Sequence, residues 1–185
     1  TGGCYCAMRR PPALDAATRV AGFVPVRAGR PIHLLSESGH SLSEAHSRGL
    51  VHRDIKPANV VVCRYGEELD FVKVLDFGIV KESEREAGDP GLTDANAIQG
   101  TPAFVAPEQA LGTMDLDGRC DVYATGCLGY WLLTAQHVFS ADTPVALLVH
   151  HVQSTPAPPS ARTELAIPAA LDEIVLACLA KNPAE

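Results

Sequence analysis

The chain has 185 residues, of which 46% are hydrophobic and 20% are charged, as is ordinary for one soluble globular domain with its own core. Its 22 acidic residues outnumber the 15 basic ones and give a net charge of −7, which argues against a nucleic-acid-binding surface. The longest apolar stretch, residues 122–133, is shorter than the ~20 residues that a membrane-spanning helix needs, so no membrane segment is expected within this chain.

The cysteines predict neither a zinc site nor a disulfide framework. None of them belongs to a C-x-x-C pair, and residues 1–4 do not resemble the start of a secretion signal. We therefore expect reduced thiols in a cytoplasmic protein, while a membrane anchor beyond the C-terminal end stays open. The cysteines are Cys4, Cys6, Cys63, Cys120, Cys127 and Cys178.

The N-terminal part of the chain lacks a periodic pattern. Residues 1–30 include the helix-breaking run Arg9-Arg10-Pro11-Pro12, and we expect them to be loosely structured. A helical pattern follows over residues 31–48, and Gly49 is a suitable C-terminal stop for this helix.

Short apolar runs in the next part of the chain predict strands. Leu50 to His52 has the character of a short buried strand. The apolar runs 60–63 and 71–75 enclose the polar residues 64–70, which together predict a β-hairpin.

The second half of the chain is predicted to be a long loop followed by helices. Residues 79–105 show no periodicity and are rich in Glu, Asp, Gly and Thr, which is typical of a functional loop. Residues 121–134 are apolar on nearly all sides, as in a buried central helix. Further helices are predicted from Pro144, with Asp142 or Thr143 as cap, and over 171–180.

Residues 52–59, with the sequence HRDIKPAN, combine groups that phosphoryl transfer to a hydroxyl requires. Asp54 can orient the hydroxyl and accept its proton, and Lys56 can reach the transferring phosphate. Asn59 offers a neutral carbonyl oxygen, a ligand that suits a hard ion such as Mg²⁺.

A second acidic motif, Asp76-Phe77-Gly78, directly follows the predicted strand 71–75. Asp76 lies 22 residues after Asp54, which is enough chain for a loop and a hairpin. We expect the hairpin to return the second carboxylate to the side of the first.

These motifs resemble those of eukaryotic-like protein kinases. HRDIKPAN, then DFG, then Ala106-Pro107-Glu108 is similar to the catalytic loop, the metal loop and the APE motif of that family. The sequence GTPAFVAPEQ over 100–109 looks especially like the bacterial serine/threonine members. DVYATG from Asp121 resembles the start of the central buried helix of the family, and the last eight residues resemble its final motif.

The resemblance covers about residues 31–185 and implies a protein-kinase-like fold restricted to the C-terminal lobe. This lobe would be mostly α-helical, with a small β-hairpin at the active site. It would comprise a catalytic loop at 52–59, an activation segment at 76–108 and a helical subdomain at 120–185. Residues 1–30 would form a separate segment of unclear origin.

The resemblance implies a protein serine/threonine kinase that transfers the γ-phosphate of ATP to protein substrates. Asp54 would be the catalytic base and Lys56 would steady the γ-phosphate. Asn59 and Asp76 would hold Mg²⁺. Thr101 would contact Asp54 and Lys56 and help to select serine or threonine as the acceptor.

Other residues would have supporting roles in the family. Asp121 would hold the backbone of the catalytic loop from below, and His52 and Phe77 would stack between the lobes. The residues that would stack beneath the adenine are Val61, Leu128 and Leu132.

Arg53 precedes Asp54, a pairing that in the family implies control by phosphorylation of the activation loop, because the arginine can grip a phosphate. Thr93, eight residues before Thr101, is the preferred phosphosite, and Ser83 is the second choice.

The family also has an upper lobe that precedes the predicted helix 31–48. No G-x-G-x-x-G occurs in the chain, and no V-A-I-K-like lysine precedes Asp54. We therefore expect the N-terminal lobe to be absent and ATP to bind very weakly, with an affinity of about millimolar or worse. Without the arginine that the family has just beyond Glu185, Glu108 is expected to be hydrated or protonated.

Three alternatives stay open beside the kinase. The chain could be a non-catalytic kinase-like binding module that docks partners through its helices. The missing upper lobe favours this for the chain as given, although intact Asp54, Asn59 and Asp76 argue against it for the parent protein. A small-molecule kinase is disfavoured by Lys56, Thr101 and the APE segment, which build a peptide-binding platform. The third alternative is a purely structural fragment.

Overall fold

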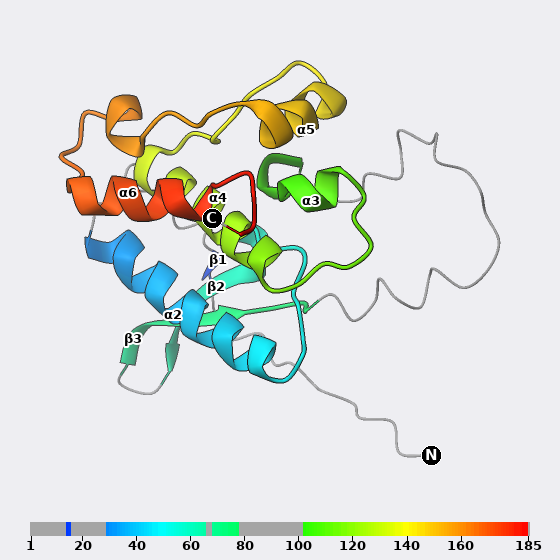
Figure 1. Ribbon diagram of the computed structural model, residues 1–185. Coiled ribbons are helices and arrows are strands. Elements are labelled where there is room, and N and C mark those ends of the chain that lie inside the picture. Colours follow the sequence, from blue (N-terminus) through cyan, green and yellow to red (C-terminus); the bar gives the residue numbers. More distant parts are fainter. Residues whose placement is uncertain (1–13, 16–28, 66–67, 78–101, 185) are drawn as a thin grey trace, which may run out of the picture.

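The computed structural model describes residues 14–15, 29–65, 68–77 and 102–184. Figure 1 shows α4 near the centre, with α6 on its left, α3 on its right, α5 at the top, and α2 and the small sheet below. Helix α2 packs against both α4 and β3, and α4 also packs against α6. The predicted mostly helical lobe with a small sheet is confirmed.

Helix α2, Gly29–Ser47, begins two residues before the predicted start and ends one residue before the predicted end. Leu34, Ser38 and Leu42 are buried at spacings of four residues, so this stripe faces the core. Gly49 follows in the left-handed region at φ +74°, and its N–H donates to the carbonyl of His46. Glycine adopts this conformation without strain, so it ends the helix as the sequence predicted.

The sheet has three antiparallel strands in the order β1-β2-β3: Leu14–Asp15, Val60–Tyr65 and Glu68–Val74. The predicted hairpin is confirmed as β2 and β3. Val60 and Val62 are buried, whereas Val61 is on the opposite face, because side chains alternate along a strand. Strand β1 lies within the N-terminal segment, where the sequence pattern indicated no element.

The predicted strand Leu50 to His52 is wrong. These residues have no strand partner among the described residues and lead into the irregular segment 52–59. The N–H of His52 donates to the carboxylate of Asp121 instead of to a neighbouring strand. A side chain therefore satisfies a backbone group that the apolar pattern had suggested would join a ladder.

Helix α4, Arg119–Thr134, is the centre of the core, and the prediction of a buried helix over 121–134 is confirmed. It is buried on nearly all sides. A Cβ on Gly126 would lie 2.7 Å from the Cβ of Cys178 in α6, so this glycine permits the close approach of the two helices. The helix ends at Ala135, which has the left-handed φ of 58°.

The remaining elements surround α4. Helix α5 begins at Pro144, and Thr143 is its cap, since its Oγ1 accepts the N–H of Ala146 at 3.1 Å. Helix α6 begins and ends two residues before the predicted 171–180. Within the described part of the chain, no helix is both long and apolar enough to cross a membrane. The bounds of the remaining elements are η1 Pro57–Asn59, η3 Pro102–Phe104, α3 Pro107–Ala110, α5 Pro144–Gln153, η4 Pro159–Arg162 and α6 Ala169–Cys178.

Candidate active site

Asp121, in the first turn of α4, holds the loop that carries the candidate catalytic residues. Its side chain is 1% exposed. Its Oδ2 accepts the N–H of His52 at 2.8 Å, and its Oδ1 accepts the N–H of Arg53 at 2.7 Å. The Nε2 of His46 in α2 lies 2.8 Å from the same Oδ2. The carboxylate thus joins α2, α4 and the loop at one buried point.

Arg53 has a strained backbone that is fixed from both sides. Its φ is +66°, a left-handed value that is uncommon for any residue with a Cβ. Its N–H is bound to Asp121, and its carbonyl oxygen accepts the side-chain N–H of Gln109 at 2.9 Å. Strain of this kind persists only where the surroundings over-determine the backbone, and it is concentrated at functional sites.

Asp54, Lys56 and Asn59 are brought together as the sequence suggested. The Nζ of Lys56 lies 2.9 Å from Oδ2 of Asp54, and both side chains are partly buried. Nδ2 of Asn59 donates to the carbonyl of Asp54 at 2.7 Å and lies 3.3 Å from its Oδ2. The carboxylate therefore has its two positively polarised neighbours on the Oδ2 side, which leaves Oδ1 for another partner.

Leu75, the residue before Asp76, ties the second acidic motif to the first. Its N–H donates to the carbonyl of Asn59 at 2.8 Å, and its carbonyl lies 2.8 Å from Nε2 of His52. Nδ1 of His52 accepts the N–H of Asp54 at 3.2 Å, so the ring is the neutral tautomer with its hydrogen on Nε2. The imidazole of His52 thus connects Leu75, which precedes Asp76, with the backbone N–H of Asp54.

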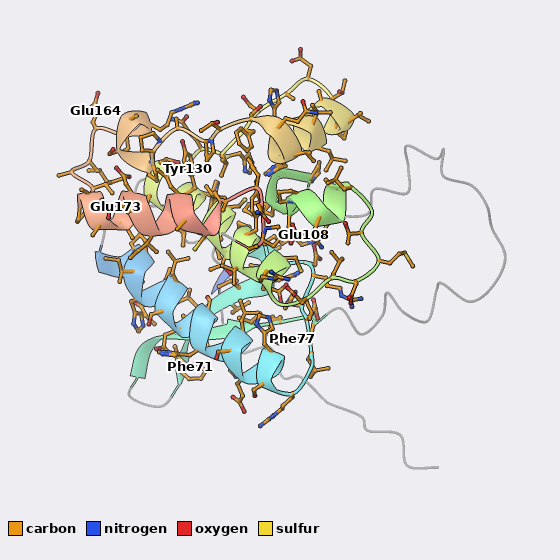
Figure 2. The ribbon with its side chains drawn as sticks, in the orientation of Figure 1. Phe71, Phe77, Glu108, Tyr130, Glu164 and Glu173 are labelled. Carbon is orange, nitrogen blue, oxygen red and sulfur yellow. The ribbon has the colours of Figure 1, made fainter. Side chains whose placement is uncertain are left out.

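Asp76 itself is exposed and has a left-handed φ of 58°. The next residue, Phe77, packs on His52 with 4.8 Å between ring centroids, and Figure 2 labels Phe77 near the sheet below α4. The stacking of His52 and Phe77 that the resemblance implied is therefore present in the structure. The tilted ring pair also adds apolar burial at the start of the activation segment.

The residues expected beneath the adenine lie in two different elements, the sheet and helix α4. Val61 is partly buried on the face of the sheet that looks away from the helical core. Leu128 and Leu132 are each 1% exposed inside the core of α4. These two leucines can support the sheet from below, but as placed they cannot touch a ligand directly.

The activation-segment predictions divide between described and undescribed residues. Thr93, Thr101 and Ser83 lie outside the described residues. Glu108, labelled in Figure 2, is the second residue of α3 and is partly exposed. It makes no ion pair within the described ranges, so its carboxylate reaches water.

Two contributors to the site were not identified from the sequence. Gln109 donates directly to the carbonyl of Arg53, 56 residues away, whereas His46 acts through Asp121, 75 residues away. Gln109 directly follows the APE motif, and its polar side chain at that place is the signal that could have identified it. Nothing local distinguishes His46 from other helix residues.

Burial makes the cysteine next to Asp121 chemically inert. Burial raises the pKa of the Cys120 thiol to about 12, and the neighbouring Asp121 carboxylate acts in the same direction. The thiol stays protonated at neutral pH and points its weak donor at Oδ1 of Asp121, 3.9 Å away. Cysteine chemistry therefore does not compete with carboxylate chemistry at this site.

Comparison with known proteins agrees with this geometry. The family model described as "Protein kinase domain" matches residues 27–185. The serine/threonine-protein kinases pkn3 and Pkn1 of Myxococcus xanthus are 38% and 43% identical over 185 and 159 residues. PknB of Mycobacterium tuberculosis is 40% identical over 161 residues. These alignments cover 100%, 86% and 86% of this chain, but the chain spans only 34%, 22% and 24% of the three relatives.

The alignment with pkn3 includes residues 1–30, so the likeness is not limited to residues 31–185 as the sequence motifs had suggested. Among solved structures, Rad53 1–466 in complex with AMP-PNP superposes with a TM-score of 0.72 over 92% of this chain and 40% of that chain. At 23% identity that likeness shows the fold alone. The chain belongs to the protein kinase domain family, among its bacterial serine/threonine-protein kinases.

Proposed function

We propose that the protein transfers the γ-phosphate of ATP to serine or threonine residues of protein substrates, with Asp54 as the catalytic base. The observation that carries the proposal is the arrangement at Asp54, whose Oδ2 lies 2.9 Å from the Lys56 ammonium and 3.3 Å from the Asn59 amide. Phosphoryl transfer depends mainly on positioning the reactants and on stabilising charge. Asp54 and Asn59 would serve the positioning, and Lys56 would stabilise the charge.

The acceptor hydroxyl would bind at Oδ1 of Asp54, the oxygen that Lys56 and Asn59 leave available. A carboxylate there orients the hydroxyl oxygen toward the phosphorus and takes its proton as the new bond forms. The Lys56 ammonium lies 2.9 Å from Oδ2 of Asp54 and would present its charge toward the phosphate being transferred. The side chain of Asn59 keeps the whole loop in place through its bond to the Asp54 carbonyl.

The residues present fit a magnesium ion and the nucleotide that the family implies. Because Nδ2 of Asn59 faces Asp54, its Oδ1 points to the other side of the amide, and Asp76 adds an exposed carboxylate. Amide and carboxylate oxygens are the ligands that Mg²⁺ takes in such sites. When bound, Mg²⁺ neutralises charge on the phosphates of ATP. Val61 offers the adenine an apolar surface on the outer face of the sheet.

The buried Nε of Arg53 supports control by phosphorylation. Its Nε is buried without a hydrogen-bond partner among the described residues. A buried donor without a partner costs free energy, so a conformation that brings an acceptor to this Nε is favoured over one that does not. We propose that phosphorylated Thr93 supplies that acceptor, and that Thr101 contacts Asp54 and Lys56 to complete the acceptor site.

The test is transfer of phosphate from labelled ATP to casein by the 185-residue chain and, where the reading frame continues upstream of Thr1, by the longer protein. We expect Asp54→Asn to abolish transfer and Asp115→Asn, the same change of charge at an exposed position, to preserve it. Equal transfer by wild type and Asp54→Asn would remove the catalytic role. Absence of transfer from every form would leave the kinase-like binding module as the better reading.

A further inference from the structure

Gln109 bridges helix α3 and the catalytic loop with both ends of its side-chain amide. Its Oε1 accepts the N–H of Ala106, the cap of α3, at 3.1 Å. Its Nε2 donates to the carbonyl oxygen of Arg53 at 2.9 Å. The two bonds run in opposite chemical directions, so the position requires an acceptor and a donor on one side chain of this length.

The Arg53 carbonyl is a sensitive point to hold. The φ of Arg53 is +66°, and Asp54 is the next residue, so the peptide between them sets the direction in which the Asp54 side chain leaves the backbone. Asp121 fixes only the N–H of Arg53. The bond from Gln109 fixes the other polar group of the residue, and with it the orientation of the peptide that leads to Asp54.

We propose that Gln109 is a positioning residue that couples α3 to the orientation of the Asp54 carboxylate. This inference rests on the function proposed for Asp54. Residues 102–110, which include η3 and α3, directly follow the undescribed part of the activation segment. When α3 is docked, Gln109 therefore fixes the Arg53 carbonyl and, through the next peptide, the orientation of Asp54. Displacement of α3 would free both.

Two substitutions separate this role from helix capping. Gln109→Glu keeps an oxygen for the Ala106 N–H but removes the donor and turns a negative oxygen toward the Arg53 carbonyl. Gln109→Met keeps the length and removes both bonds without adding charge. If capping were the only role, Gln109→Glu would behave as wild type and only Gln109→Met would be impaired.

A matched control is available at Gln136. Its Nε2 donates to the carbonyl of Arg162 at 3.2 Å, so Gln136→Glu loses the same kind of bond and adds the same charge away from the catalytic loop. Gln136→Glu therefore measures the effect of replacing an amide by a carboxylate at a position that does not contact Arg53.

The first measurement is amide hydrogen exchange of the 185-residue chain, which needs no activity. We expect peptides covering 50–56 to exchange about tenfold faster in Gln109→Glu and in Gln109→Met, as loss of one such bond implies. Gln136→Glu should leave these peptides unchanged. Wild-type exchange over 50–56 in both Gln109 variants, or an equal increase in Gln136→Glu, would overturn the proposal.

The second measurement uses the form of the protein that transfers phosphate. We expect Gln109→Glu to lower kcat about tenfold while KM for ATP and for the acceptor stays within about twofold, because the base is misplaced but binding is not. A change confined to KM would overturn the positioning role. If no form transfers phosphate, the proposed function fails, and the exchange experiment still decides whether Gln109 holds the loop.

Discussion

Replacing Asp121 by asparagine changes one oxygen of the buried carboxylate into an NH₂ group and leaves the shape of the side chain intact. The carboxylate accepts the N–H groups of His52 and Arg53 and lies 2.8 Å from Nε2 of His46. The amide retains a single acceptor atom. At least one of the two backbone donors must therefore face an NH₂ group, at a side chain that is 1% exposed.

The size of the effect follows from these contacts. A buried donor left without its partner costs about 1–3 kcal/mol, and each of the two remaining bonds loses its charge assistance, about 1 kcal/mol apiece. The sum is about 3–5 kcal/mol of unfolding free energy. For a domain of this size each kcal/mol moves the melting temperature by about 2–4 °C, so Asp121→Asn should lower it by about 6–20 °C.

Thermal unfolding followed by circular dichroism, together with urea titration, measures this loss. Asp115→Asn is the control, because Asp115 is exposed six residues earlier and undergoes the same loss of charge. Its effect should stay within about 0.5 kcal/mol, as for surface substitutions in general. Equal melting temperatures for the two variants would refute the claim that the Asp121 carboxylate holds the loop.

Three further outcomes follow from burial. Burial, reinforced by a nearby lysine, lowers the pKa of His151 to about 4. The unfolded chain binds the proton more readily, so stability should fall by up to about 3 kcal/mol as pH drops from 6.5 to 4, and urea titrations should show a flatter pH dependence in His151→Gln. Gly126→Ala should lower the unfolding free energy by about 1–3 kcal/mol, because the new Cβ would contact Cys178. Gly39→Ala, where the new Cβ meets open space, should raise it by up to about 1 kcal/mol. Changes of the same sign in the two variants would contradict the packing. Iodoacetamide at pH 8 should label Cys120 only in urea, as read by mass spectrometry, and labelling of the native chain would contradict its burial.

The parts of the fold that the sequence predicted are those whose stabilisation is periodic or local. The helix from Pro144 begins where a proline follows a capping threonine, and both act within four residues of each other. Helix α4 was predictable because its residues are apolar on nearly all sides over 14 positions, as in a central buried helix. The hairpin of β2 and β3 followed from two apolar runs around a polar turn.

The parts that could not be predicted depend on partners that are distant in the sequence. Leu50 to His52 has the composition of a strand, but no strand lies beside it, and the N–H of His52 is bound by a carboxylate 69 residues away. The left-handed φ of Arg53 likewise has no local signal, because arginine has no preference for that region. Local patterns report propensity and amphipathicity, whereas these bonds depend on how α3 and α4 meet the loop.

The loop at 52–59 is thus an irregular segment whose shape is set by side chains from elsewhere. The two backbone polar groups of Arg53 are bound by Asp121 from α4 and by Gln109 from α3, and His52 binds across to Leu75. A loop that satisfies its backbone in this way has no intrinsic reason to keep a strained φ, so it keeps it only while those elements are docked. The orientation of Asp54 is therefore a property of the assembled lobe, and substitutions far from the carboxylate should alter it as strongly as substitutions beside it.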